Sequence, residues 1–383
     1  MNQLLSYTRG DRVIWFIVII LSIFSMLAVY SSTGTLVYKY QGGNTEHYLF
    51  KHAITFFLSF GLMYAAHKIR YTYYSRLSQL ALILAVPLLI LTLLMGTNLN
   101  EASRWITLPG TNITFQTSDF AKLALIIYVA RILSKKQDNI KDFKTAFVPI
   151  MLPVLIVCGL ILPANLSTAA VLFTTCLVLM FIGRVNLKYI LLLLGAGALC
   201  LTIFISIALL SNTPGRVATW KNRMGNFTKK DVDGNYQVQH AKMAIATGGL
   251  MGKGPGHSRE RNFLPHPYSD FIYAIIVEEY GLILASGIIL LYLILFYRCI
   301  KNVNKNPRAF ATLLSIGCGF SLVFQAMINM AVAVNLFPVT GQPLPLISMG
   351  GTSILFTGIA IGIILSVSRE IENEEAEMTT VAQ

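Results

Sequence analysis

The sequence predicts an all-α integral membrane protein with about ten transmembrane helices. Two observations indicate this fold: the apolar composition and the recurring apolar runs. Hydrophobic residues make up 55% of the 383 positions, charged residues make up 12%, and the mean hydropathy is +0.64. This balance is too apolar for a soluble domain of this size. Each run, at roughly 17 to 22 residues, is long enough to cross a hydrocarbon core of ~30 Å. The runs fall near 13–31, 52–66, 79–96, 118–134, 146–162, 167–183, 190–211, 271–297, 311–332 and 352–368.

The first run predicts an uncleaved transmembrane helix. It is longer than the core of a signal peptide, and no small-residue cleavage site follows it. The five cysteines lie within expected spans or at a cytoplasmic end, without the paired spacing of disulfides or zinc sites. We interpret them as packing residues: Cys158, Cys176, Cys200, Cys299 and Cys318.

The distribution of charge predicts the orientation of the chain. The formal net charge is +13, and more than half of the 30 Lys and Arg residues fall in the short segments that are cytoplasmic if the N-terminus is inside. This is the positive-inside pattern, so both termini are expected in the cytoplasm. Much of the excess charge is thereby explained without nucleic acid as a partner. We expect one polytopic membrane domain over 1–383, with a cytoplasmic tail at 369–383.

One connection is far longer than the others. Residues 212–269 form an extracytoplasmic loop between spans seven and eight, and loops of this length are usually functional or disordered. Basic residues outnumber acidic ones in it, nine to three, which favours an anionic ligand at the outer face. Alternatively, long loops are translocated regardless of charge and bind anionic headgroups of membrane lipids. A short helix is expected within the loop, at 237–247.

A glycine-rich stretch, 248–256, lies in the same loop and surrounds Lys253 with five glycines. Backbone amides in such a stretch can approach a phosphate closely, while the alternative is a flexible turn. The stretch is not a nucleotide-binding P-loop, because Gly254 stands where Ser or Thr is required.

A second irregular segment, 337–351, contains three prolines and three glycines between spans nine and ten. It cannot continue a helix, so we expect a broken or re-entrant structure that lines a cavity. Gly358 and Gly362, in the following span, form a GxxxG pattern that is typical of helix packing.

Charged residues at the outer ends of the spans require an explanation. Asp119 and Lys122 begin the fourth span on one helical face, either as a self-satisfied ion pair or as part of a ligand site. Asp270 ends the long loop directly before the eighth span, where it faces an outer cavity or caps the helix. Glu278 and Glu279 follow within that span, and adjacent buried acids require partners.

Taken together, these motifs resemble the SEDS family of bacterial wall synthesis, which comprises the FtsW and RodA proteins, and they are more similar to the FtsW branch. The resemblance covers nearly the whole chain. Its motifs are RWITLPGTNITFQTSDFAKL at 104–123, LPANLSTA at 162–169, GGLMGKGPG at 248–256, LPHPYSDFIYAIIVEEYG at 264–281 and FPVTGQPLPLISMGGTS at 337–353. The chain departs from the family pattern at Thr117, Asp119, Asn165, His266 and Met349.

The resemblance implies a peptidoglycan glycosyltransferase that polymerises lipid II at the outer face of the cytoplasmic (inner) membrane during cell division, at the septum. The family's key aspartate matches Asp270, the expected general base, and undecaprenyl diphosphate is the leaving group of an inverting transfer. The expected substrate- and diphosphate-binding residues are Arg104, Lys122, Arg216, Lys253, Gln116, Thr340 and Ser348, with Asp119, Glu278 and Glu279 in support.

The resemblance also implies a divalent cation, Mg²⁺ or Mn²⁺, with Asp270 and Asp119 as candidate ligands. The expected partners are lipid II, the undecaprenyl-linked glycan strand, a class B penicillin-binding protein, other division proteins and membrane lipids. Three alternatives remain: an elongation-type (RodA) polymerase, a flippase for lipid-linked precursors, and a non-catalytic scaffold of the division machinery.

Overall fold

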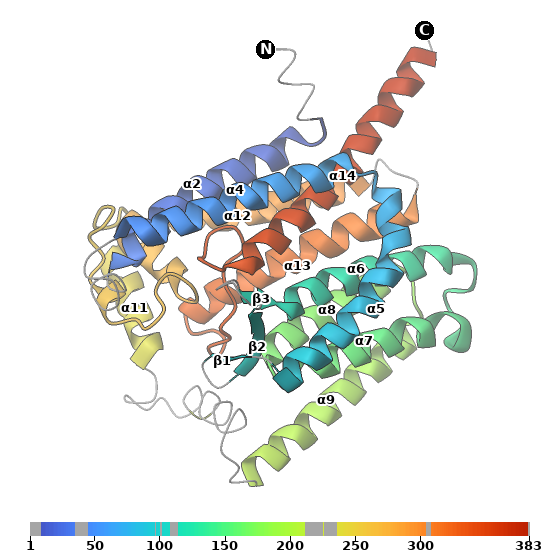
Figure 1. The fold of residues 1–383 in the computed structure, drawn as a ribbon, viewed down its shortest axis with the longest axis horizontal. Helices are drawn as coiled ribbons and strands as arrows, with labels where there is room; N and C mark the ends of the chain where they lie inside the picture. Colours follow the sequence, from blue (N-terminus) through green and yellow to red (C-terminus); the bar gives the residue numbers. More distant parts are fainter. Residues whose placement is uncertain are drawn as a thin grey trace. The chain divides into compact units, whose positions relative to one another are not determined.

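The chain divides into two compact units, which are described here one at a time (Figure 1). The first unit comprises Met1–Arg70, Lys230–Lys305 and Leu322–Gln383, and the second comprises Tyr71–Lys229 and Asn306–Ser321. The computed structural model describes residues 9–34, 45–95, 97–99, 102–107, 114–210, 225, 236–303 and 308–381.

Each expected apolar run falls on a helix. The helices are α2 (Arg12–Ser32), α4 (Thr45–Lys68), α5 (Tyr71–Met95), α6 (Thr117–Lys135), α7 (Val148–Ile161), α8 (Leu166–Ile182), α9 (Leu187–Leu210), α12 (Ile272–Val303), α13 (Ala309–Ala333) and α14 (Thr352–Val381). Helices α4 and α5 begin seven and eight residues earlier than expected, and α12 and α14 end six and thirteen residues later. Among the described residues, seven helices are long and apolar enough to cross a membrane. The chain is therefore a multi-pass membrane protein, while the count of ten spans and the orientation stay predictions.

In the first unit, α14 packs along α4, and the two helices run side by side in Figure 1. A Cβ atom at Gly358 would overlap the backbone and hydroxyl of Ser59, and one at Gly362 would overlap the carbonyl oxygen of Met63. The packing role expected of these glycines is therefore confirmed. Beyond the apolar part of α14, the expected cytoplasmic tail is helical through Val381.

The described part of the long loop is folded against the first unit. Helix α11 (Tyr236–Gly248) confirms the expected short helix, and it packs on α12. Nδ1 of His240 lies 2.5 Å from Oε2 of Glu260, which begins the 3-10 turn η3 (Glu260–Asn262). The imidazole ring of His240 stacks on the ring of Phe263. This half of the loop is thus a packed structure.

The second unit contains a small antiparallel sheet, which the all-α prediction missed. Strands β1 (Thr97–Leu99), β2 (Ala102–Thr107) and β3 (Thr114–Gln116) pair in the order β1-β2-β3, with Trp105 opposite Gln116. The strands are rich in β-branched and aromatic residues, but they are too short to register against the long apolar runs. The sheet leads directly into α6.

The remaining elements of the second unit are helical. The 3-10 turn η1 (Gln137–Asn139) and the π turn η2 (Phe143–Phe147) connect α6 to α7.

Of the cysteines whose side chains are described, Cys158, Cys176, Cys299 and Cys318 are all buried and free, as expected of packing residues. The side chain of Cys200 lies outside the described residues.

The segment between α13 and α14 has the broken structure that its prolines and glycines predict. Residues 334–351, all of which are described, contain no helix or strand, yet Leu344, Ile347 and Ser348 are buried. The hydroxyl of Tyr292, from α12, donates a hydrogen bond to the carbonyl oxygen of Pro345. The irregular backbone is therefore held by protein groups, as it must be away from water.

Candidate functional site

Asp270 lies half-buried immediately before α12, in the first unit. The carbonyl oxygen of Phe271 accepts the first helical bonds, from the amides of Ala274 (3.0 Å) and Ile275 (3.4 Å). The cap position therefore falls on Phe271, and Asp270 precedes it. Its carboxylate oxygen Oδ1 accepts a hydrogen bond of 3.1 Å from the hydroxyl of Ser269.

The backbone leading to this carboxylate is fixed at three consecutive carbonyl groups. The carbonyl of Tyr268 accepts a hydrogen bond from the amide of Met349 at 3.0 Å, and the carbonyl of Ser269 accepts one from the hydroxyl of Ser348 at 2.6 Å. The carbonyl of Asp270 itself accepts one from Nδ2 of Asn329 at 3.1 Å.

The donors to these carbonyls belong to one network that includes α13 and the 334–351 segment. Nδ2 of Asn329 also donates to the carbonyl of Gln342 at 2.7 Å, and Nε2 of Gln325 donates to Pro343 at 2.9 Å. The Ser348 oxygen also accepts the amide of Leu344 at 2.7 Å. Asn329 was not predicted from the sequence, although a polar residue in an apolar span is a signal of function.

Two further buried residues support this network from α2 and α4. The hydroxyl of Ser25 donates to the carbonyl of Ile347 at 2.8 Å, and Nε2 of His52 lies 2.9 Å from the same hydroxyl. Thr340, an expected substrate contact, is half-buried in the same irregular segment. Ser348, the other expected contact there, is buried, with its hydroxyl proton donated to the carbonyl of Ser269.

Lys253 and Glu278 form a close ion pair. The ammonium nitrogen of Lys253 lies 2.6 Å from Oε1 of Glu278, and the carboxylate is fully buried while the lysine side chain is 28% exposed. Glu278 also accepts hydrogen bonds from the hydroxyl of Ser258 (2.5 Å) and from the amides of Arg259 (3.1 Å) and Glu260 (3.3 Å). The partners that the sequence analysis required for Glu278 are therefore present.

Glu279 connects α12 to the C-terminal end of α2. Its Oε1 accepts hydrogen bonds from the hydroxyl of Ser31 and, at 3.3 Å, from the amide of Ser258. The guanidinium of Arg261 donates to the carbonyl of Ser31 at 2.8 Å. Both adjacent acids thus bind neighbouring segments to α12: Glu278 holds the long loop, and Glu279 holds both the loop and α2.

The glycine-rich stretch packs against a break in α12. Gly281 has φ of 79° and ψ of 172°, which interrupts the helix. The amides of Lys253 and Gly254 donate to the carbonyls of Glu278 and Glu279, each at 2.9 Å. These two amides are engaged by protein, so the stretch is neither a phosphate cradle at these positions nor a flexible turn.

The glycines are explained by this close approach of two backbones. A Cβ atom at Gly248 would overlap the carbonyl of Val277, one at Gly252 would overlap the carbonyl of Glu279, and one at Gly281 would overlap the carbonyl of Leu250. Only glycine fits such a crossing.

The other expected site residues belong to the second unit. Lys122 lies 3.7 Å from Oδ1 of Asp119, and both side chains are largely buried. Nε2 of Gln116 donates to the hydroxyl of Ser118 at 3.0 Å. Arg104 lies in β2, with its side chain outside the described residues, and Arg216 lies outside them altogether.

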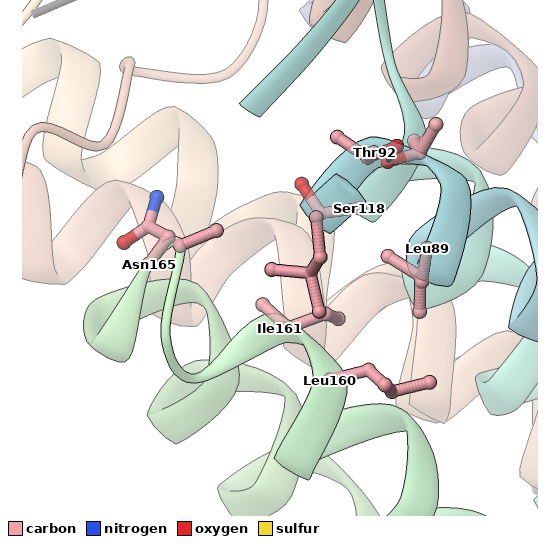
Figure 2. Close-up of a pocket in the computed structure, with 9 residues that line it drawn as sticks. Leu89, Thr92, Ser118, Leu160, Ile161 and Asn165 are labelled. Carbon is pink, nitrogen blue, oxygen red and sulfur yellow. Dashed lines mark hydrogen bonds between the residues drawn. The ribbon is translucent and has the colours of Figure 1, made fainter. Parts of the chain in front are cut away.

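A pocket opens beside the first turn of α6 in this unit. Its lining is apolar apart from three hydroxyl groups and one amide, and Figure 2 shows Thr92 and Ser118 on one side with Leu160 on the other. The space it encloses, including the open solvent at its mouth, is about 280 Å³. The lining residues are Leu89, Thr92, Leu93, Thr117, Ser118, Leu160, Ile161, Ala164 and Asn165.

The candidate metal ligands are Asp270 in the first unit and Asp119 in the second. Within the described ranges, no group of three His, Cys, Asp or Glu side chains is placed to hold a metal ion. Mg²⁺ takes few protein ligands when substrate phosphate and water supply the rest. Asp270 fits such a site as a single carboxylate ligand, whereas Asp119 lies against an ammonium group.

Comparison with known proteins places the chain among wall-synthesis proteins. The profile of the FtsW/RodA/SpoVE family, described as "Cell cycle protein", matches residues 11–373. The "Probable peptidoglycan glycosyltransferase FtsW" of Geobacter sulfurreducens is 31% identical over 369 residues, covering 95% of this chain and 96% of that protein. The "Stage V sporulation protein E" of Bacillus subtilis is 31% identical over 377 residues, covering 94% and 98%.

Two solved structures share the fold. A chain from the "Structural coordination of polymerization and crosslinking by a peptidoglycan synthase complex" has a TM-score of 0.75 at 24% identity, covering 94% of this chain and 98% of that one. The "Rod shape determining protein RodA" of Thermus thermophilus has a TM-score of 0.68 at 23% identity, covering 94% and 97%. Because the family profile and both sequence relatives extend over almost its whole length, the chain belongs to the FtsW/RodA/SpoVE family of cell cycle proteins.

Proposed function

We propose that this protein is a peptidoglycan glycosyltransferase that polymerises lipid II into glycan strands at the outer face of the cytoplasmic (inner) membrane. The names of its FtsW relatives support this activity, and a role at the division septum is part of the proposal. The observation that carries the proposal is the position of Asp270. The residue is half-buried just before an apolar helix, on a backbone fixed at three consecutive carbonyls.

In the proposed reaction, Asp270 accepts the proton of the acceptor sugar's 4-hydroxyl. That oxygen then attacks the anomeric carbon of the growing strand, and the bond from this carbon to undecaprenyl diphosphate breaks. A single displacement inverts the anomeric centre and requires only one base, as in inverting glycosidases. A positioned base contributes ~10²- to 10⁴-fold.

The departing diphosphate requires positive charge in a partly dehydrated site. Lys122, Arg104 and Arg216 are the proposed cations, with Gln116 and Thr340 as polar contacts. Lys253 is a weaker candidate than Lys122 because its ion pair is closer, at 2.6 Å from Glu278 against 3.7 Å between Lys122 and Asp119. A divalent cation, when bound, would neutralise diphosphate charge, with Asp270 as its proposed protein ligand. Asp119 stays a second candidate, with its Oδ1 3.7 Å from the Lys122 ammonium nitrogen.

The proposed partner is a class B penicillin-binding protein, which would cross-link the strands. The structural likeness to a component of a complex that coordinates polymerization and crosslinking supports this partnership. Other division proteins are further proposed partners. The long basic loop would contact substrate or anionic headgroups on the outer side.

Three alternative functions predict different experimental results. A flippase would move lipid II across a bilayer without joining its sugars, an elongation-type polymerase would make strands outside division, and a scaffold would support division without polymerising. The placement of the acidic groups near helix ends favours an enzyme over a transporter, whose site is expected near the midplane.

The test is to give purified protein fluorescent lipid II in detergent and in vesicles. Glycan strands that a muramidase digests are the expected product. Movement of lipid II between leaflets with no strands in either setting would contradict the enzyme and favour the flippase.

A further inference from the structure

We propose that Asn329 and Ser348 are positioning residues that fix the Asp270 carboxylate by binding the main-chain carbonyls of Asp270 and Ser269. This inference rests on the proposed function, because it assigns Asp270 the role of base. Neither side chain is placed against the substrate. Each acts through the backbone on which the carboxylate is mounted.

Asn329 suits this role because a carboxamide nitrogen carries two protons. One donates to the carbonyl of Asp270 at 3.1 Å and the other donates to that of Gln342 at 2.7 Å. The opposite amide orientation would point an oxygen at two carbonyl oxygens, so the assignment of nitrogen and oxygen is determined. One buried side chain thereby joins the Asp270 backbone to the irregular segment after α13.

Ser348 acts on the preceding carbonyl. Its hydroxyl donates to Ser269 at 2.6 Å and accepts the amide of Leu344 at 2.7 Å. With the amide of Met349 on the carbonyl of Tyr268, every carbonyl from 268 to 270 has a donor. The peptide groups before and after Asp270 cannot rotate without breaking one of these bonds, so the direction of its carboxylate is restricted.

A packing role alone does not account for Asn329. The residue is 1% exposed within an apolar helix, and across the ranges that the structure describes its Oδ1 has no hydrogen-bond partner. Burying an unsatisfied acceptor destabilises a fold. An apolar side chain would avoid that penalty, but it would leave the Asp270 and Gln342 carbonyls without these bonds.

The experiment replaces the amide by a carboxyl of the same shape. Asn329→Asp removes both N–H donors, and we expect kcat of strand synthesis to fall ~10²-fold, the scale of a displacement of about 1 Å in a catalytic group. KM should stay within about twofold of wild type, because Asn329 does not contact substrate.

Gln325 provides the matched control, since it lies one turn earlier on α13 and binds the same segment at Pro343. Gln325→Glu introduces a buried acid and removes that bond, but the hydrogen bond to Asp270 remains. Its kcat should stay within about threefold of wild type. An equal fall in kcat for Asn329→Asp and Gln325→Glu would overturn the proposal, because it would indicate general damage to packing.

Ser348→Ala is the second variant. It tests the positioning role by itself if thermal unfolding and size-exclusion chromatography show that Asn329→Asp does not fold. We expect kcat to fall about tenfold with KM unchanged, since one of three carbonyl bonds is lost. A folded variant with wild-type kcat, or with raised KM alone, would overturn the proposal.

Asp270→Asn separates this inference from the function on which it rests. If Asp270→Asn polymerises normally, the proposed base is wrong whatever the other variants do. If Asp270→Asn is inactive while folded Asn329→Asp and Ser348→Ala keep full kcat, only the positioning role is wrong.

Discussion

Lys253 donates a hydrogen bond of 2.6 Å to Glu278, whose carboxylate is fully buried. The pair joins the glycine-rich stretch of the long loop to α12, two turns after Asp270. Lys253 is expected to bind the substrate diphosphate, and in the structure its ammonium group faces a protein carboxylate. Two roles for this lysine, structural and substrate-binding, therefore make different predictions.

Replacing Lys253 with Met should destabilise the protein, because it leaves a buried carboxylate without its counter-charge. The expected loss is on the order of 3 kcal/mol, visible as a lower apparent Tm in detergent. Lys242→Met, on the exposed face of α11, is the matched control and should leave Tm unchanged. A raised KM for lipid II at unchanged Tm would show that Lys253 binds substrate instead.

Replacing Gly281 with Ala should disrupt the crossing between α12 and the glycine-rich stretch. With φ of 79° and ψ of 172°, Gly281 lies in a backbone region that essentially only glycine adopts, which costs about 1–3 kcal/mol for a residue with a Cβ atom. That atom would also overlap the carbonyl of Leu250. Gly287, in the same helix, has nothing within 4 Å of the added atom. Gly287→Ala should therefore leave the apparent Tm unchanged. Equal shifts in Tm for Gly281→Ala and Gly287→Ala would refute this explanation.

Replacing Lys122 with Met should weaken binding of lipid II. A charge-assisted hydrogen bond to phosphate contributes about 1.5–3 kcal/mol, so KM should rise roughly 10- to 100-fold. The Asp119→Asn/Lys122→Met double variant removes the ion pair without leaving one charge behind, and it separates stability from binding. We expect it to recover Tm but not KM, whereas recovery of both would reduce the pair to a structural role.

Chelation of divalent cations with EDTA should stop strand synthesis, and excess Mg²⁺ or Mn²⁺ should restore it. The diphosphate would supply most of the ligands, and throughout the described ranges no three-residue metal cluster supports the fold. The apparent Tm should accordingly be unchanged by EDTA. Full polymerisation in its presence would exclude the cation from the reaction.

The helices were predictable because each one follows a long apolar run, and α2, α12 and α14 begin within a residue or two of their predicted starts. Strand β2 was not predicted, because six residues with a weak alternation do not stand out beside runs of three times that length. The expected short helix in the long loop, now α11, shows that the described part of that loop folds.

The site was predictable only in part. Asp270 could be singled out from its position and from a motif, since a carboxylate before an apolar helix is a local pattern. The roles of Asn329 and Ser348 could not be predicted, because they depend on contacts with carbonyls 59 and 79 residues away in the chain. Backbone acceptors look alike at every position, so no residue type marks them in advance.

The proposed mechanism depends most directly on the carboxylate at position 270. Purified Asp270→Asn keeps the size of the side chain and removes the base, so its rate of strand synthesis from fluorescent lipid II is the decisive measurement. We predict a rate lowered at least ~10²-fold with an unchanged Tm and intact partner binding. Strands formed at close to the wild-type rate by the folded variant would contradict the account.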